Sequence, residues 1–287
     1  MGQSFDGSRD VCGIAANGKP GRRAVCHHLG VRGTRVRLDQ LLVDRGLAAT
    51  RSRAQALLLG GRVRAGAGDG ARRDRKPGDL VEPELELEVE APEPYVSRGG
   101  HKLAAALDAF DIDPRDRVCL DVGASTGGFT DVLLQRGARR VYALDVGRGQ
   151  LAESLRADPR VVSMERFNAR DLTAETLPEA VSLATMDVAF ISSRLLLGPV
   201  VTTFRGGSGD LVILVKPQFE AGRGEVPGGV VRDGAVHERV VREVAAAASA
   251  LGLDVGGTVP SPILGPEGNR EFLLWARVPG DGPEVPA

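Results

Sequence analysis

The sequence predicts a two-domain protein, in which a small α+β unit precedes a larger α/β domain with a mostly parallel, doubly wound sheet of seven strands. Three observations predict this architecture. Short apolar runs alternate with helical stretches between residues 117 and 277, as strands and crossover helices do in a parallel sheet. A glycine-rich turn, Gly123 to Gly128, follows the first of these runs. The segment before residue 92 instead has two helical patterns and one long alternating stretch.

The amino-terminal third contains the predicted small unit. Residues 1–34 have no helical or strand period and are rich in Gly and Arg, so we expect a disordered extension. After it, leucine spacing predicts one helix that ends at Gly46 and a second that runs from Thr50 to Gly60. A short strand should follow. Apolar residues then alternate with glutamates over residues 80–90, which predicts a single strand with one face in solvent.

The string RLDQLLVDRGLAATRSRAQALLLGGRVRAG, followed by KPGD, resembles the small RNA-binding domain named after ribosomal protein S4. The resemblance implies an RNA-binding domain over residues 35–91 and an interdomain linker over residues 92–98. Arg presents a planar fork of hydrogen-bond donors that suits phosphate oxygens. The candidate phosphate contacts are Arg37, Arg51, Arg53, Arg62 and Arg64. Several of these arginines could equally be solvated charges on helix faces.

The charges are unevenly distributed, although the formal net charge is only −1. Residues 1–79 contain 16 Lys and Arg against 7 Asp and Glu. A basic amino-terminal segment attached to an acidic domain is typical of a protein that binds a polyanion through the basic segment. A solvated basic tail is the alternative.

The larger domain begins with a helix that Ser97 to Lys102 open, with Leu103 and Leu107 on one side. Strands are then predicted at 117–122, 140–145, 160–164, 183–191, 210–215, 253–259 and 270–277. Helices are predicted at 128–136, 149–156, 193–204 and 235–252. In such a sheet the ligand site lies at the carboxyl ends of the strands. Residues 279–287 are expected to be a disordered tail.

The glycine-rich turn is the predicted cofactor site, because a strand, a turn and a helix start bring backbone N–H groups and a positive helix end together. Its sequence, GASTGG, lacks the Gly-x-Gly-x-x-Gly spacing of nicotinamide dehydrogenases, which are the weaker alternative. It resembles the first motif of S-adenosylmethionine-dependent methyltransferases, with Asp121 two residues before Gly123. Asp145 ends the next strand, where a carboxylate can accept hydrogen bonds from two ribose hydroxyls.

Ten motifs occur in series between residues 97 and 275: SRGGHKL, CLDVGASTGGFTDVLLQRGA, DVGRGQL, DPRVV, ERFNARDL, DVAFIS, LVKPQFEAGR, GGVVRD, SPI-x-GPEGN and EFLLW. Together they resemble the TlyA family of ribosomal-RNA ribose methyltransferases, a family also named hemolysins. The resemblance that they carry covers residues 35–278. The resemblance implies an FtsJ-like, Rossmann-like methyltransferase domain over residues 99–278. It also implies S-adenosylmethionine as methyl donor and the ribose of a cytidine in 16S or 23S rRNA as acceptor. The cofactor-binding candidates are Asp121, Gly123, Ala124, Ser125, Thr126, Gly127, Gly128, Phe129, Asp145, Asn168 and Asp171.

FtsJ-like enzymes share a Lys-Asp-Lys-Glu set, and the matching positions here are Lys102, Asp187, Lys216 and Glu271. Methyl transfer to a hydroxyl needs an in-line approach and a base that takes the proton. Lys216 follows an apolar strand, and burial beside a second cation favours a neutral amine, so Lys216 is the candidate base. Asp187 and Glu271 would orient the lysines, while Lys102 would position the ribose or the adjacent phosphate.

Each of these four charged residues also has an ordinary structural explanation, such as a helix-surface charge or a strand-end cap. Their joint placement at the ends of separate elements favours a site. Asp171 could equally cap its own loop. Residues 217–234 are a candidate lid or RNA-contact loop, or only a surface connection.

Composition argues against several classes of protein. No stretch approaches the roughly 20 consecutive apolar residues of a membrane helix, and residues 1–34 have no apolar region of signal-peptide type. We therefore expect a cytoplasmic protein without a membrane partner. Cys12, Cys26 and Cys119 lack paired metal spacing, so neither a metal site nor a disulfide is expected.

Three functions are to be considered for a chain with these features. The first is a methyltransferase that acts on rRNA or ribosomal subunits, with a monomer favoured. The second is a non-catalytic RNA-binding or ribosome-assembly factor that keeps the fold. The third, a hemolysin, is disfavoured because no apolar segment suits membrane lysis.

Overall fold

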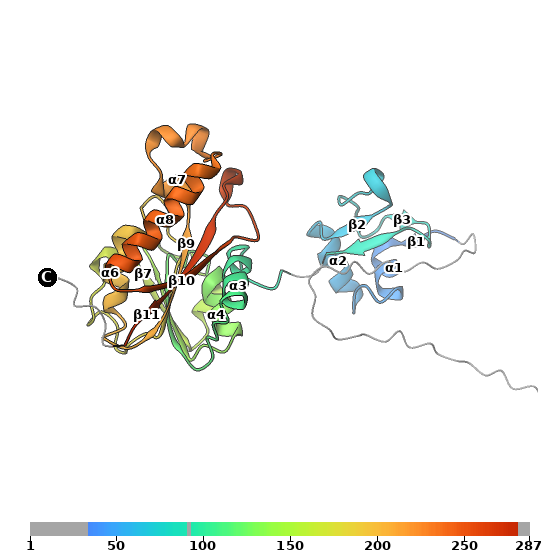
Figure 1. Ribbon diagram of the computed structural model, residues 1–287. Helices are drawn as coiled ribbons and strands as arrows, with labels where there is room; N and C mark the ends of the chain where they lie inside the picture. Colours follow the sequence, from blue (N-terminus) through green and yellow to red (C-terminus); the bar gives the residue numbers. More distant parts are fainter. Residues whose placement is uncertain (1–33, 91–92, 281–287) are drawn as a thin grey trace, which may run out of the picture. The chain divides into compact units, whose positions relative to one another are not determined.

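The computed structural model describes residues 34–90 and 93–280. The chain forms two compact units that divide between Pro92 and Glu93 (Figure 1). Each unit has its own apolar core. The disorder predictions for the amino-terminal extension and the carboxyl-terminal tail fall almost entirely on residues 1–33 and 281–287, which lie outside the described residues.

The smaller unit packs two helices against two antiparallel strand pairs. The helices are α1 (Leu38–Asp44) and α2 (Arg51–Leu59), and a short 3-10 turn is η1 (Gly68–Gly70). The pairs are β1 (Val36–Arg37) with β3 (Leu80–Val81), and β2 (Val63–Ala65) with β4 (Leu87–Val89). Both helices are present as predicted, and the Thr50 hydroxyl caps α2 by accepting a hydrogen bond from the Arg53 N–H at 3.2 Å.

The single strand predicted over residues 80–90 is wrong, because the chain turns between β3 and β4. Pro83 has no backbone N–H to donate to a strand partner. The Leu85 N–H bonds back to the Glu82 carbonyl at 3.0 Å, and the Arg45 guanidinium donates to the Leu85 carbonyl at 2.7 Å. The alternation of apolar and charged residues continues through this turn, so the sequence pattern did not reveal it.

The larger unit is built on one sheet of seven strands in the order β10-β11-β9-β8-β5-β6-β7. The strands are β5 (Val118–Val122), β6 (Arg140–Asp145), β7 (Val161–Glu165), β8 (Leu183–Met186), β9 (Gly209–Val215), β10 (Asp254–Pro260) and β11 (Phe272–Val278). Strands β5 to β9 pair in parallel, and β11 is antiparallel to both of its neighbours. The predicted mostly parallel, seven-stranded sheet is confirmed.

Helices cover both faces of this sheet (Figure 1). One face packs α3 (Gly99–Ala109), α4 (Gly128–Gln135) and α5 (Glu153–Arg156), and the other packs α6 (Arg194–Thr202) and α8 (Gly234–Ala250). Strand β5 serves both layers, since Leu120 joins the α6–α8 core whereas Cys119 joins the α3–α4 core. The shorter elements are α7 (Pro217–Glu220), η2 (Ala169–Asp171), η3 (Arg223–Glu225), η4 (Pro227–Gly229) and η5 (Pro266–Gly268).

Two predicted elements are shorter than expected, and both differences shape the site. The strand predicted over 183–191 ends at Met186, and the chain leaves the sheet in a loop in which Phe190 has a left-handed backbone (φ +64°). The helix predicted over 149–156 is helical only from Glu153, because Gly149 has φ +66° and Ala152 is extended.

No helix in the described ranges combines the length and the apolar character that crossing a bilayer would require.

Candidate active site

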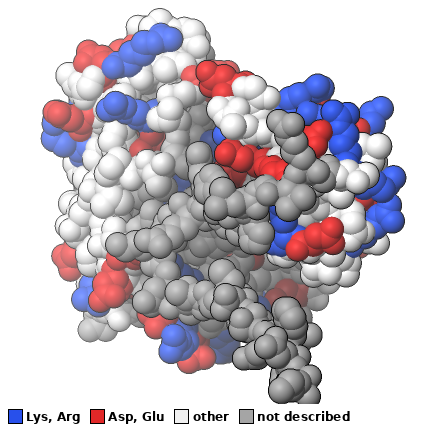
Figure 2. All heavy atoms as spheres, turned by 90° about the vertical axis from the view of Figure 1, so that its right-hand side faces the viewer, with Lys and Arg blue, Asp and Glu red and all other residues white. Residues whose placement is uncertain are grey.

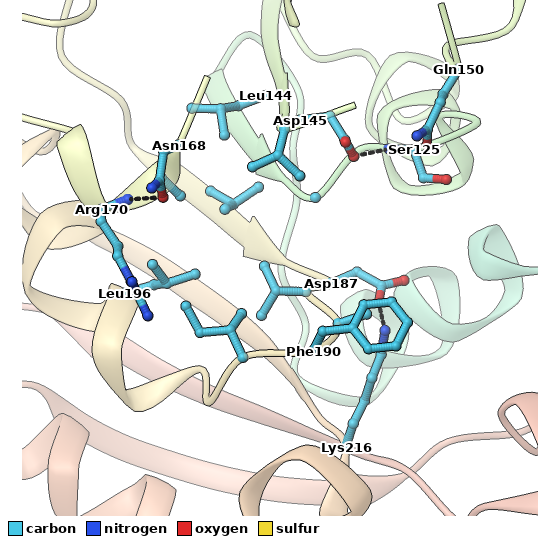
Figure 3. Close-up of a pocket in the computed structure, with 17 residues that line it drawn as sticks. Ser125, Leu144, Asp145, Gln150, Asn168, Arg170, Asp187, Phe190, Leu196 and Lys216 are labelled. Carbon is cyan, nitrogen blue, oxygen red and sulfur yellow. Dashed lines mark hydrogen bonds and ion pairs between the residues drawn. The ribbon is translucent and has the colours of Figure 1, made fainter. Parts of the chain in front are cut away.

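A pocket of about 620 Å³ opens at the carboxyl ends of β5, β6, β8 and β9 (Figure 3). This is the edge at which a parallel sheet is expected to bind ligands. The pocket brings together six of the residues predicted from the sequence: Gly123, Ser125, Asp145, Asn168, Asp187 and Lys216.

Other lining residues were missed by the sequence reasoning, among them Leu144, Gln150, Arg170, Phe190 and Leu196. Three of them lie inside motifs that the sequence did single out: Gln150 in DVGRGQL, Arg170 in ERFNARDL and Phe190 in DVAFIS. Phe190 lies within the range of the strand predicted over 183–191, which ends at Met186.

The glycine-rich turn lies very close to the loop that follows β8. Gly123 has φ +85°, and a Cβ at this position would come within 2.4 Å of the Asp187 carbonyl oxygen. Gly127 has φ +99°, and a Cβ there would come within 2.3 Å of Leu155 Cδ1. Only glycine satisfies both the backbone conformation and the space at these two positions. The turn is therefore pressed against the wall of the pocket that carries Asp187.

Most of the remaining predicted residues of the turn are buried, whereas Thr126 is exposed. Phe129 is buried in the α3–α4 core, and Ala124 is also buried. Ala124, Thr126, Gly127, Gly128 and Phe129 are not among the residues that line the pocket.

Asp145 is held at the mouth of the pocket by two backbone donors. One carboxylate oxygen accepts a hydrogen bond from the Ser125 N–H at 2.8 Å, and the other accepts one from the Gly147 N–H at 2.6 Å. Each oxygen keeps a further acceptor position. Across the pocket, the Asn168 side-chain oxygen accepts from the Arg170 N–H at 3.1 Å, while Asp171 is exposed in η2 and does not line the pocket.

Asp121 lies beneath the turn and does not reach the pocket surface. Its carboxyl group is fully buried, with one oxygen 2.7 Å from the Thr130 hydroxyl and the other 3.1 Å from the Thr185 hydroxyl. Burial raises the pKa of Asp121 to about 7, against the opposing effect of these hydrogen bonds. The residue joins the first turn of α4 to β8 across β5.

Two lysine–carboxylate pairs lie at the same edge of the sheet. Lys216 Nζ lies 2.5 Å from Asp187 Oδ1, and these side chains are 12% and 22% exposed (Figure 3). Lys102 pairs with Glu271, and these side chains are 9% and 0% exposed. Charges this far removed from water are tolerated when they are paired.

The register of the sheet explains why the four charged residues meet. Phe272 pairs with Val215, so Glu271 and Lys216 occupy neighbouring positions just beyond the two paired strands. Lys102 reaches Glu271 from α3. The same helix begins close to the other pair, because a Cβ on Gly99 would lie 4.0 Å from Asp187 Oδ2.

The two pairs differ in their access to the pocket. Lys216 and Asp187 line it, whereas Lys102 and Glu271 do not. The first pair can therefore meet a ligand directly, while the second supports it from the side of α3 and β11.

In the smaller unit, a buried carboxylate gathers two of the predicted arginines. Asp39 accepts hydrogen bonds from Arg37 at 3.0 Å, Arg51 at 3.0 Å and Gln55 at 2.9 Å. The hydrogen bond from Arg37 holds the pKa of Asp39 well below its usual range. Because two half-exposed guanidinium groups share one carboxylate, positive charge remains in excess on this surface.

The other predicted arginines are placed differently. Arg53 is exposed on α2, and Arg62 follows that helix in the turn before β2. Arg64 lies in β2, donates to the Gly68 carbonyl at 2.5 Å and lies 3.6 Å from a carboxylate oxygen of Glu88.

The charge of the smaller unit is more balanced than the count over residues 1–79 suggested. Residues 34–90 contain 11 Lys and Arg and 10 Asp and Glu, because five glutamates follow in residues 82–90. Three of them pair with arginines: Glu82 with Arg35, Glu88 with Arg64, and Glu90 with Arg73. Figure 2 shows Lys and Arg interspersed with Asp and Glu on the visible face. An RNA surface there would consist of a few arginines.

Within residues 34–90 and 93–280, no cluster of three or more His, Cys, Asp or Glu side chains could hold a metal ion. Cys119 is a buried core residue, and burial raises the pKa of its thiol to about 12.

Comparison with known proteins identifies relatives for both units. A model of FtsJ-like methyltransferases matches residues 95–278. The 16S/23S rRNA (cytidine-2'-O)-methyltransferase TlyA of Mycobacterium tuberculosis is 49% identical over 250 residues, which cover 86% of this chain and 91% of that protein. Hemolysin A of Brachyspira hyodysenteriae is 40% identical over 240 residues, covering 83% and 98%. A solved structure from Streptococcus thermophilus that carries the name hemolysin has a TM-score of 0.65 at 42% identity, covering 88% of this chain and 92% of that one.

Gly123→Ala is expected to lower the free energy of unfolding by about 3 kcal/mol or more, because it combines a left-handed backbone with a clash against the Asp187 carbonyl. Gly149→Ala is the matched control: it has φ +66° but nothing within 4 Å of a Cβ, so it should cost only about 1 kcal/mol. Urea unfolding measures both, and equal losses would show that the close approach to Asp187 is unimportant.

Asp121→Asn is expected to change the pH dependence of stability. In wild type, the buried Asp121 keeps its proton up to about pH 7, whereas the unfolded chain loses it near pH 4, so this group lowers stability as pH rises through that window. The asparagine variant lacks this loss. Its free energy of unfolding, relative to wild type, should therefore increase by roughly 2 to 4 kcal/mol between pH 4 and pH 7 and then remain level. Urea unfolding at several pH values measures this difference, and a difference independent of pH would contradict the assignment.

Proposed function

The chain belongs to the FtsJ-like methyltransferase family, and from this premise we propose that it transfers a methyl group from S-adenosylmethionine to a ribose 2'-hydroxyl of ribosomal RNA. A cytidine in 16S or 23S rRNA is the proposed acceptor, in line with the name of the Mycobacterium tuberculosis relative. The observation that carries the proposal is the Lys216–Asp187 pair, which lies inside the pocket and beside the glycine-rich turn.

The pocket has the groups that S-adenosylmethionine requires. Asp145 offers free acceptor positions to two ribose hydroxyls, and its carboxylate is already fixed by backbone donors. Leu144, Val146 and Leu196 supply apolar walls for a flat base. A volume of about 620 Å³ lies within the range of small-molecule sites. We expect Gly123 and Asn168 to contact the same ligand.

S-adenosylmethionine supplies a methyl group that is bonded to a positively charged sulfur. When the methyl group is transferred, this sulfur becomes a neutral thioether. The protein must then hold the acceptor hydroxyl in line and remove its proton. Lys216 Nζ is the proposed proton acceptor. Asp187 holds this amine in place at the wall of the pocket.

The Lys102–Glu271 pair has a supporting role in this proposal. Because Glu271 is fully buried, its charge depends on Lys102, and removing either partner would leave an uncompensated charge. Lys102 keeps a second positive charge beside the Lys216 site. Since Lys102 does not line the pocket, its proposed influence on the ribose or its phosphate acts through this charge beside Lys216.

The smaller unit is proposed to bind the RNA. Arg37 and Arg51 are pre-oriented by Asp39 while their guanidinium groups stay half exposed, and Arg53 is exposed next to Arg51 along α2. A guanidinium fixed before binding loses less side-chain entropy when it meets a phosphate.

Mapping ribose methylation of rRNA from a deletion strain tests the proposed function. One or more 2'-O-methyl groups should disappear and return when the gene is restored. Unchanged methylation would contradict the proposal, and a Lys216→Ala protein that restores the full biological effect would favour a non-catalytic assembly factor.

Lys216→Met and Lys216→Arg should both reduce methyl transfer by about 100- to 10,000-fold, the usual contribution of a positioned base. The arginine variant separates charge from proton acceptance, because a guanidinium keeps the pair with Asp187 but does not deprotonate. Single-turnover transfer and S-adenosylmethionine affinity should be measured together, and affinity should change less than threefold. Full activity of Lys216→Arg would exclude Lys216 as the base.

Arg51→Ala is expected to weaken binding of deproteinised 23S rRNA and to reduce the slope of log K against log salt by about 1, since one phosphate contact is lost. Arg72→Ala is the control, because Arg72 is neutralised by two hydrogen bonds to Asp74, at 2.9 and 2.7 Å. Salt titrations of both variants measure the slope. Equal effects would show that the surface around Asp39 is not an RNA contact.

A further inference from the structure

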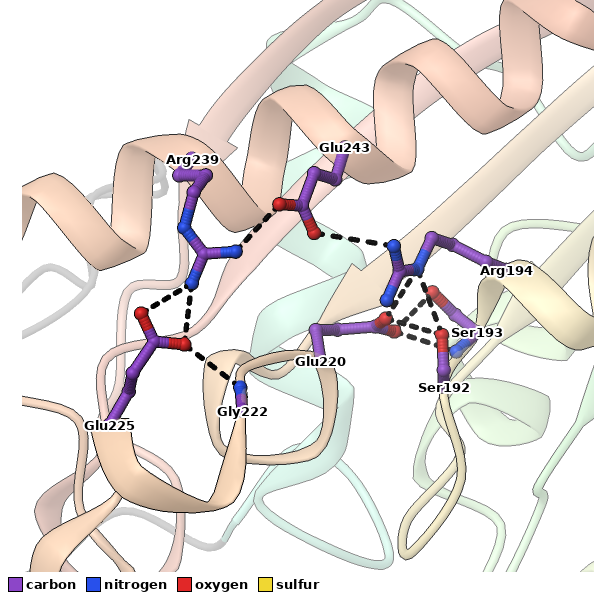
Figure 4. Close-up of polar contacts among 8 residues, drawn as sticks. All are labelled: Ser192, Ser193, Arg194, Glu220, Gly222, Glu225, Arg239 and Glu243. Atoms are coloured by element: carbon purple, nitrogen blue, oxygen red, sulfur yellow. Dashed lines mark hydrogen bonds and ion pairs between the residues drawn. The ribbon is translucent and has the colours of Figure 1, made fainter.

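Glu220 ends α7, four residues after Lys216, and its side chain is only 3% exposed. Its carboxylate accepts four hydrogen bonds (Figure 4). The donors are the Ser192 hydroxyl at 2.5 Å, the Ser193 N–H at 2.6 Å, the Ser193 hydroxyl at 2.7 Å and Arg194 Nε at 3.2 Å. A buried carboxylate is costly unless it is paired and hydrogen-bonded, and here both conditions are met.

The four donors all lie on the segment that follows Asp187. This loop leaves β8 at Met186, carries Asp187 and Phe190, and enters α6 at Arg194. One carboxylate thus joins the segment after β8 to the segment after β9. These are the two segments that carry the partners of the Lys216–Asp187 pair.

A second contact joins the same two segments. The rings of Phe190 and Phe219 lie 5.2 Å apart, the first on the loop and the second in α7. Phe190 is 92% exposed, so this ring contact buries little apolar surface. Among the described residues, the hydrogen bonds to Glu220 are therefore the main polar attachment of this loop to α7.

The contacts continue outward to the protein surface (Figure 4). Arg194 Nη1 lies 3.2 Å from Glu243, which Arg239 contacts at 2.6 Å, and Arg239 also reaches Glu225. These outer side chains are about one-third exposed, and exposed ion pairs contribute little to stability. The outer part of the network therefore provides a control for the buried part.

We propose that Glu220 is a positioning residue for methyl transfer: by holding the loop after β8 against α7, it keeps Asp187 and Lys216 in contact while the acceptor nucleoside enters. This inference deepens the proposed function and rests on it. Glu220 does not line the pocket, so it acts through the two segments that it joins. The groups proposed to hold the ribose of S-adenosylmethionine, Asp145 and the turn after β5, lie on other segments.

The test compares Glu220→Gln with Glu225→Gln in the full chain. The first replaces a fully occupied buried acceptor by an amide that presents donors to Ser193. The second makes the same change at the exposed end of the network, where the carboxylate accepts from Gly222 and Arg239. Two readouts are measured for each: kcat with S-adenosylmethionine affinity, and amide hydrogen exchange over residues 187–194.

Glu220→Gln should lower kcat by about 10- to 100-fold, the effect of losing hydrogen bonds to a buried charged group. The affinity for S-adenosylmethionine should stay within twofold of wild type, and amide hydrogen exchange over residues 187–194 should become at least about tenfold faster. Glu225→Gln should match wild type in all three. If Glu220→Gln fails to fold, Ser193→Ala is the alternative variant. It removes the hydroxyl donor and keeps the hydrogen bond from the Ser193 N–H to Glu220. It should lower kcat less, with the same faster exchange and the same unchanged affinity for S-adenosylmethionine.

Unchanged exchange over residues 187–194 in a folded Glu220→Gln protein would overturn the inference, as would a kcat within twofold of an active wild type. A fall in kcat together with an equal fall in the affinity for S-adenosylmethionine would also overturn it, because it would indicate a general structural role for Glu220. If wild type itself transfers no methyl group to RNA, the proposed function fails, and the exchange measurement still decides whether Glu220 holds the loop.

Discussion

The burial of two lysine–carboxylate pairs at one edge of a sheet is the constraint on which the rest of this structure depends. Buried charges are stable only with a partner at close range, so four separate elements must deliver their side chains accurately. Strands β8 and β9 end beside each other and provide Asp187 and Lys216. Antiparallel β11 begins beside the end of β9, which brings in Glu271, and α3 crosses to supply Lys102. The reversed direction of β11 thus has a direct consequence for the site.

The two sides of the pocket are built by different means. The side proposed to bind the methyl donor depends on backbone geometry: Gly123 approaches the Asp187 carbonyl, and Asp145 is fixed by N–H groups of the neighbouring turns. The side proposed to bind the acceptor depends on charged side chains and on the hydrogen bonds between Glu220 and the loop after β8. Asp121 connects the two sides beneath the turn, because it bonds to Thr130 in α4 and to Thr185 in the strand that leads to Asp187.

Much of the fold could be predicted because apolar periodicity is a local signal, and each strand of the larger unit left one. The prediction failed where a turn did not interrupt the pattern, as at Pro83, and where a strand ended inside an apolar run, as at Met186. Motifs placed Asp145, Asp187 and Lys216 in the site, but they did not predict which lysine pairs with which acid. That pairing depends on the register between β9 and β11. The network of Glu220 was also unpredictable, since its members are separated by as many as 51 positions in the sequence.

The central claim is that Lys216 and Asp187 direct a methyl group to a ribose oxygen of RNA. The most direct test is transfer from S-adenosylmethionine with an isotope-labelled methyl group to rRNA that lacks this modification, followed by alkaline hydrolysis. A 2'-O-methyl group blocks cleavage of the adjacent phosphodiester, so the label should appear in alkali-resistant dinucleotides. Label recovered in single nucleotides would place the methyl group on a base and contradict the account, as would the absence of any transferred label.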